Sequence, residues 1–114
     1  KEIRKGEEFD YTILFKNLLE DHYKDIKSVE RFASLMSVSE KKLNKSTNFV
    51  LGKSPKEIID ERIILEAKRL LAHTGSSIKE VGYELGFEET TNFIKYFKKH
   101  VKKTPIEFRG AFYS

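Results

Sequence analysis

The sequence contains no cysteine, which excludes disulfide bonds and thiolate metal sites and fits a reducing cytosol. Its apolar runs are too short to span a bilayer, and it contains no signal-peptide core. The three histidines, His22, His73 and His100, lack the spacing of metal ligands. We therefore expect no metal, no cofactor and no membrane contact, and a cytoplasmic location.

The sequence also lacks any recognisable catalytic constellation. It contains no phosphate-binding glycine-rich loop and no serine, histidine and aspartate arrangement typical of a hydrolase. The acidic cluster of Glu57, Asp60 and Glu61 lies beside Arg62 on one expected helix, where it is typical of capping and i,i+4 ion pairs. We therefore expect no catalytic residue and no enzymatic activity.

The chain has 114 residues, of which 39% are hydrophobic, enough for one globular domain with a modest core. It begins at Lys1 without a methionine, and we expect it to be part of a longer protein. The net charge of +4 is concentrated in two segments. Residues 39–53 carry four lysines against one glutamate, and residues 88–103 carry five lysines against two glutamates. Concentrated positive charge is a weak but consistent indication of nucleic-acid binding.

Helical signals cover the chain, and no segment alternates as a strand would, so the fold class is predicted to be all-α. Three capping boxes predict helix starts, at Ser54 with Glu57, at Ser77 with Glu80 and at Thr104 with Glu107. Both prolines of the chain follow such a cap directly. The residues expected to bury apolar side chains in the helix after Ser54 are Ile58, Ile59, Ile63, Leu65, Leu70 and Leu71.

The order of these signals predicts two helix–turn–helix units, at residues 28–52 and 77–102, joined by a helix at 54–73 and followed by a final helix at 104–110. Before them we expect a linker or a fraying terminus at residues 1–9. A first helix is expected from about Asp10, its cap, to Tyr23, because apolar residues recur there at three-to-four spacing, namely Ile13, Leu14, Leu18, Leu19 and His22 or Tyr23. A joining helix of about 20 residues is about 30 Å long, close to the ~34 Å repeat of the DNA major groove.

Four segments resemble the DNA-binding domain of AraC/XylS transcription regulators over residues 10–110. They are Ala-Lys-Arg-Leu-Leu (67–71), Ser-Ile-Lys-Glu-Val-Gly-Tyr-Glu-Leu-Gly-Phe (77–87), Phe-Ile-Lys-Tyr-Phe-Lys-Lys (93–99) and Thr-Pro-Ile-Glu-Phe-Arg (104–109). The resemblance implies seven helices in two homeodomain-like units that bind a specific double-stranded DNA sequence in a bacterium. It also implies an N-terminal sensor or receiver module and makes RNA polymerase a candidate partner.

The resemblance also assigns roles to residues of the two recognition helices. The implied base contacts are Lys41, Asn44, Lys45, Thr90, Thr91, Ile94 and Lys95. The phosphate candidates are Ser39, Lys42, Lys53, Lys98 and Lys99. Leu43, Phe93 and Phe97 are expected to face the core.

Several of these roles have structural alternatives. Asn44 can pair with adenine or simply face solvent, and each lysine can belong to a solvated basic face. Thr90 and Thr91 lie where threonine caps a helix. Ile94 can touch a thymine methyl group or pack within the domain.

The sequence departs from the family pattern at four points. Thr47 replaces a usual phenylalanine, which predicts a different packing of the first unit. Gly82 replaces a usual alanine, at a cost of up to about 1 kcal/mol of helix stability. Lys102 lies where a glycine commonly ends the second recognition helix. Neither recognition segment contains arginine, so the bidentate arginine–guanine contact is excluded there.

The competing function is a helical protein-interaction module whose basic face docks an acidic partner. Steep salt dependence and preference for one duplex over scrambled DNA distinguish DNA binding from this alternative.

Overall fold

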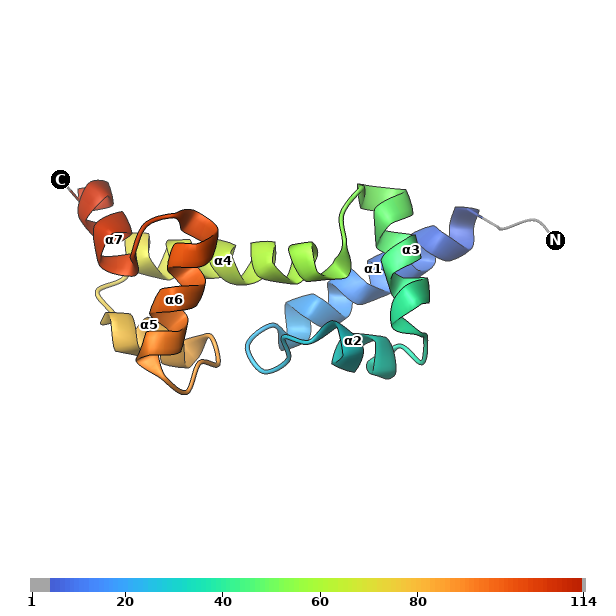
Figure 1. Ribbon diagram of the computed structural model, residues 1–114, viewed down its shortest axis with the longest axis horizontal. Helices are drawn as coiled ribbons and strands as arrows, with labels where there is room; N and C mark the ends of the chain where they lie inside the picture. Colours follow the sequence, from blue (N-terminus) through green and yellow to red (C-terminus); the bar gives the residue numbers. More distant parts are fainter. Residues whose placement is uncertain (1–4, 114) are drawn as a thin grey trace. The chain divides into compact units, whose positions relative to one another are not determined.

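The computed structural model describes the backbone of residues 5–113 and the side chains of residues 6–112. The described chain forms seven α-helices and no strand, as the sequence predicts (Figure 1). The helices are α1 (Lys5–His22), α2 (Val29–Leu35), α3 (Glu40–Leu51), α4 (Pro55–His73), α5 (Ile78–Glu84), α6 (Thr90–Val101) and α7 (Pro105–Tyr113).

The described chain divides into two compact units, one ending at Asp60 and the other beginning at Glu61. The division falls inside α4, which is one continuous helix of 19 residues. Each unit therefore contains part of α4 and one pair of successive helices, α2 with α3 or α5 with α6.

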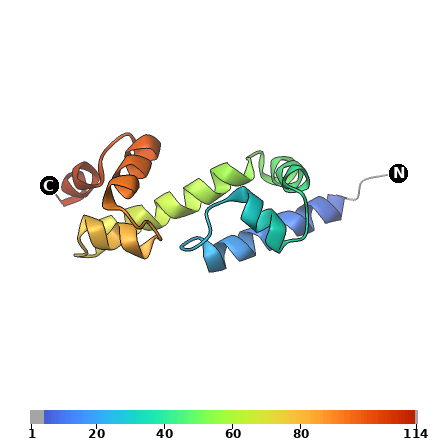
Figure 2. The same ribbon diagram turned by 60° about the horizontal axis from the view of Figure 1, so that its bottom comes forward.

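In the N-terminal unit, α3 packs across α1, and α2 contacts both (Figures 1 and 2). Phe15 of α1 and Phe32 of α2 are fully buried, and their rings meet edge to face with centroids 5.4 Å apart. Thr47, where the family pattern has phenylalanine, is also fully buried, and its hydroxyl donates to the Asn44 carbonyl oxygen at 3.4 Å. The first unit thus closes its core here with a smaller residue.

The first helix was predicted incorrectly in two respects. It begins at Lys5 rather than near Asp10, so residues 5–9 of the expected linker are helical, while residues 1–4 lie outside the described residues. Its buried face carries Glu8, Thr12, Phe15 and Leu19, whereas Ile13 and Leu14 are exposed. The positions of apolar residues did not reveal this face, because two of its buried positions hold polar side chains, Glu8 and Thr12.

The C-terminal unit has an aromatic core built on α6. Phe93 and Phe97 are fully buried, as expected, with ring centroids 6.0 Å apart. Phe87, in the turn after α5, packs on Phe93, and Phe108 of α7 packs on Phe97. Gly86 supplies the positive φ of 91° that this turn requires.

The helix ends agree closely with the predicted caps. In all three capping boxes, the glutamate carboxylate accepts from the cap residue's N–H at 2.7–2.8 Å. At the other end of α4, the Arg109 guanidinium donates to the carbonyl oxygens of Leu71, at 2.9 Å, and Thr74, at 3.3 Å. A positive side chain satisfying terminal carbonyls is favourable at a helix C-terminus. Arg109 thereby fastens α7 to α4 within the C-terminal unit.

Candidate nucleic-acid interface

Helix α3 presents one polar face to solvent and buries the opposite face. Leu43 is completely buried, as the sequence analysis expected, and anchors the helix in the N-terminal unit. The three predicted base-contact side chains of this helix, Lys41, Asn44 and Lys45, are exposed. Lys41 and Asn44 are three residues apart and therefore lie on the same side of the helix.

Asn44 is held by a neighbour that the sequence analysis missed. The Asn48 amide donates to the Asn44 carbonyl oxygen at 2.8 Å and lies 3.2 Å from the Asn44 side-chain oxygen. This contact restricts the orientation of the Asn44 side-chain amide. It involves the oxygen of that amide and not the NH₂ group of Asn44. The signal was present in the sequence, because the two asparagines are four residues apart on an exposed helix face.

Two lysines of α3 are paired with carboxylates of α1. The Lys42 Nζ lies 3.3 Å from the Glu7 carboxylate and 5.4 Å from the centre of the Tyr11 ring. The Lys45 Nζ lies 4.0 Å from the carboxylate of Glu8, which is only 4% exposed. Part of the positive charge predicted to face DNA is therefore compensated inside the unit. These pairs were not expected from the sequence, because Glu7 and Glu8 lie in residues 1–9, which were expected to precede the first helix.

The remaining phosphate candidate at the start of α3 also has a structural role. Ser39 is the N-cap of α3, and its hydroxyl accepts from the Lys42 N–H at 3.0 Å. Lys53 lies just beyond Gly52, which ends the helix with a φ of 68°, and is exposed. These two residues lie at opposite ends of the same recognition helix.

Helix α6 begins without a side-chain cap. Its N-cap is Glu89, which makes no capping hydrogen bond through its side chain. Thr90 and Thr91 follow as the first two helical residues, so the predicted capping role belongs to neither of them. The first N–H groups of a helix attract anions when no side chain satisfies them. The start of α6 is therefore chemically suited to a phosphate.

The outer face of α6 is polar and basic. Thr91 and Lys95 are exposed and lie four residues apart, whereas Thr90 and Ile94 are half-buried. The partial burial of Ile94 is consistent with both of the roles considered for it. Lys98 and Lys99 are exposed in the last turn. Asn92, which the sequence analysis did not consider, is also exposed, three residues before Lys95.

The part of the chain that the structure describes contains neither a candidate metal cluster nor a helix that could span a membrane. Residues 5–113 contain no group of three or more histidine, aspartate and glutamate side chains that could hold a metal ion. None of the helices in this range is long and apolar enough to cross a membrane.

Comparison with known proteins places these features in a family. Residues 32–111 match the model of a helix-turn-helix domain. A curated relative, the HTH-type transcriptional activator RhaS of Enterobacter sp. (strain 638), is 29% identical over 91 residues. The match covers 80% of this chain and 33% of that relative, so the chain spans about a third of the length of the curated protein.

Solved structures share the fold. A transcriptional regulator from Chromobacterium violaceum with an AraC-type DNA-binding domain is 25% identical, with a TM-score of 0.75 over 92% of this chain and 94% of that one. The DNA-binding domain of the global transcriptional factor AdpA, solved with a target DNA, is 22% identical, with a TM-score of 0.75 over 90% and 91%.

These relatives are transcription regulators rather than enzymes, and the family match covers most of both helix–turn–helix units. The chain belongs to the AraC/XylS family of helix-turn-helix transcription regulators, and it is a DNA-binding domain of that family.

Proposed function

We propose that this domain binds a specific double-stranded DNA sequence by placing α3 and α6 in successive segments of one major groove. The observation that carries the proposal is the matching design of the two helices. Each buries an apolar face, through Leu43 on α3 and through Phe93 and Phe97 on α6. Each exposes polar side chains that can read base edges, Lys41 and Asn44 on α3 and Thr91 and Lys95 on α6.

The proposed chemistry divides between reading and positioning. The base-reading residues are Lys41, Asn44, Lys45, Thr90, Thr91, Ile94 and Lys95. Amide and ammonium groups can bind adenine or guanine edges, and a threonine or isoleucine methyl group can contact the methyl of thymine. The residues proposed to bind phosphate are Ser39, Lys42, Lys53, Lys98 and Lys99. Phosphate contacts fix the register on the duplex without reading its sequence.

The continuous helix α4 supports a fixed spacing between the two recognition helices, α3 and α6. Its 19 residues extend about 28 Å, at ~1.5 Å per residue. Adjacent major-groove segments on one side of a duplex are about 34 Å apart. A helix is stiffer than a loop of the same number of residues, so it can hold a defined phase between two bound segments.

We further propose that the domain works within a longer bacterial regulator in the cytoplasm. The curated relative is about three times as long as the matched segment, which leaves room there for a sensor or receiver module. That relative is named a transcriptional activator, which supports RNA polymerase as a partner of the whole protein. Both proposals concern the full-length protein rather than this domain alone.

The proposal is tested by selecting bound sequences from a random duplex pool and measuring affinity for the selected site against salt. We expect two blocks of preferred bases centred about 10 base pairs apart. With six to eight phosphate contacts, log K should fall against log salt with a slope of about −5 to −7, at ~0.9 per phosphate. A single block would contradict the use of two helices. A flat salt response without sequence preference would favour a protein-interaction module instead.

A further inference from the structure

The C-terminal unit contains a groove between α4 and α7 that the proposed DNA contacts do not use. It has a volume of about 610 Å³, within the range of ligand pockets, about 300–1,000 Å³. All its lining residues belong to α4 or α7, and none belongs to the recognition helix α6. We call it the α4–α7 groove.

The floor of the α4–α7 groove is apolar and partly exposed. Leu65, Ala72, Phe108 and Phe112 contribute to it. Leu65, which was expected to be buried, is 63% exposed, and Phe112 is 53% exposed. The rings of Phe108 and Phe112 stack with centroids 6.0 Å apart, which presents a continuous aromatic surface. Contiguous exposed apolar side chains in a groove mark a binding surface more often than isolated ones do.

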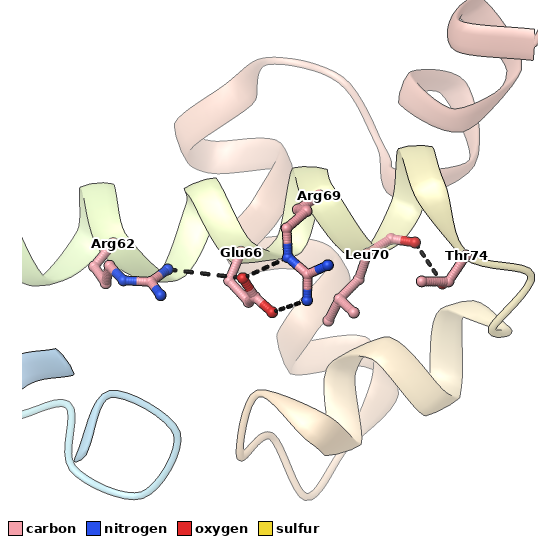
Figure 3. Close-up of polar contacts among 5 residues, drawn as sticks. All are labelled: Arg62, Glu66, Arg69, Leu70 and Thr74. Carbon is pink, nitrogen blue, oxygen red and sulfur yellow. Dashed lines mark hydrogen bonds and ion pairs between the residues drawn. The ribbon is translucent and has the colours of Figure 1, made fainter. Parts of the chain in front are cut away.

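The charges around the α4–α7 groove are mainly positive. Arg62, Lys68 and Arg69 line it, and Glu66 is the one acidic residue among the lining side chains. Glu66 is 7% exposed and is already engaged by both arginines (Figure 3). Arg69 binds it through two hydrogen bonds, of 3.0 and 2.6 Å, and Arg62 lies 3.8 Å away. The single negative charge is therefore neutralised, and the groove retains an excess of positive charge.

Lys68 connects the charged edge to the apolar floor. Its Nζ lies 5.8 Å from the centre of the Phe108 ring, within the range of a cation–π contact. The ammonium group thus lies beside the aromatic surface. A carboxylate beside an apolar side chain would match this combination of groups.

We propose that the α4–α7 groove binds an acidic amphipathic helix of a partner protein. Two apolar side chains one turn apart would rest on Leu65, Phe108 and Phe112. Acidic residues beside them would meet Arg62 and Lys68. This is the helix-in-groove mode of recognition, in which anchors recur at i, i+3 or i+4, and i+7. Because no lining residue comes from α6, the helix and DNA can bind at the same time.

The test uses a labelled peptide of about 16 residues, with leucine at i, i+4 and i+7 and glutamate on the other face, measured by fluorescence anisotropy. One comparison peptide has lysine in place of each glutamate, and another has the same composition in scrambled order. We expect the acidic helix to bind and both comparison peptides to bind at least about tenfold more weakly.

Variants locate the binding on the groove. Leu65→Glu should weaken the acidic peptide by about tenfold or more, and Lys68→Ala should weaken it severalfold, mainly at low salt. Ile106→Glu is the matched control, because Ile106 is a 69% exposed apolar residue of α7 that does not line the groove. It should leave peptide affinity unchanged. All three variants should keep wild-type helicity by circular dichroism and wild-type DNA affinity.

Three results would overturn the proposal. The first is equal binding of the acidic and basic peptides, or no measurable binding of the acidic one. The second is equal loss of binding in Leu65→Glu and Ile106→Glu. The third is concentration-dependent self-association in sedimentation that Leu65→Glu abolishes, which would make a second copy of this chain the occupant. None of these results depends on whether α3 and α6 read DNA.

Discussion

Gly82 of α5 lies directly against Phe93 of α6, so closely that a methyl group at position 82 would be 3.0 Å from both Cβ and Cγ of Phe93. Phe93 is fully buried, and its ring packs between Phe87 and Phe97. The glycine that departs from the family pattern therefore permits the contact between the two helices of the second helix–turn–helix. Its lower helix propensity is offset by this close packing.

This contact predicts the sign of a substitution. Gly82→Ala gains up to about 1 kcal/mol of helix propensity but incurs about 1–3 kcal/mol of overpacking against Phe93. We expect the free energy of unfolding to fall by about 1 kcal/mol in urea titrations. Gly110→Ala, in α7, is the control, because a methyl group there meets no atom within 4 Å. It should raise stability by about 0.5–1 kcal/mol. A gain in both variants would show that Phe93 can move aside.

A second prediction separates base reading from phosphate binding. Asn44→Ala should relax the preference at one base-pair position, most simply an A·T pair, by about 1–3 kcal/mol. Lys98→Ala should weaken all sequences by a similar factor, because a phosphate contact carries no base information. Selection from a random duplex pool with each variant measures both effects. Asn44 is not a reader if every position keeps its preference in Asn44→Ala.

A third prediction concerns the ion pair between Lys42 and Glu7, whose atoms are 3.3 Å apart. This pair directs Lys42 toward α1, whereas Lys99, another residue proposed to bind phosphate, is exposed. We expect Lys99→Ala to reduce the slope of log K against log salt by about 0.9, the value for one phosphate, and Lys42→Ala to reduce it by less. Equal reductions would show that Lys42 leaves Glu7 when DNA binds.

Most of the fold followed from short-range signals in the sequence. The capping boxes at Ser54, Ser77 and Thr104 predicted three helix starts because each is a local hydrogen-bond arrangement. Gly52 predicted a helix end for the same reason, since it supplies a positive φ. Such features need no knowledge of tertiary contacts.

The parts that were missed depend on packing between distant residues. The extension of α1 to Lys5 accompanies contacts of Glu7 and Glu8 with lysines of α3, about 35 residues later in the chain. Leu65 was assigned to the core because it is apolar, but its face of α4 opens into the α4–α7 groove. Hydrophobicity alone cannot distinguish a buried position from a binding surface. The contacts of the proposed base-reading residues with DNA remain a prediction.

A fourth prediction concerns pH. The Thr104 N–H donates to the Glu107 carboxylate at 2.8 Å and holds the pKa of that carboxyl below its ordinary 4.5. A carboxyl whose pKa is lowered by folding contributes stability above its ordinary pKa and loses it as pH falls through the folded value. The Tm of Glu107→Gln should therefore lie below that of the wild type at pH 7, and the difference should shrink toward pH 3. Glu88→Gln, outside any capping box, should show no such convergence.

The last prediction concerns α4, which carries the boundary between the two compact units. One alanine inserted between Asp60 and Glu61 should rotate the following residues by about 100° and advance them by ~1.5 Å. The Lys56–Asp60 pair lies before this point and the Arg62–Glu66 pair after it, so both pairs can persist. Each unit should therefore still fold, which circular dichroism can verify.

If α4 fixes the relative rotation and spacing of the recognition helices α3 and α6 on DNA, that insertion should remove specific binding. Non-specific, salt-sensitive binding should remain intact. The reason is geometric, because the lysines that meet phosphate remain on each unit while only one recognition helix at a time can enter its groove segment. Competition titrations with the selected site and with scrambled duplex measure the two affinities separately. If the folded insertion variant bound the selected site with wild-type affinity, the two recognition helices would not be rigidly coupled. One unit would then supply the specificity alone.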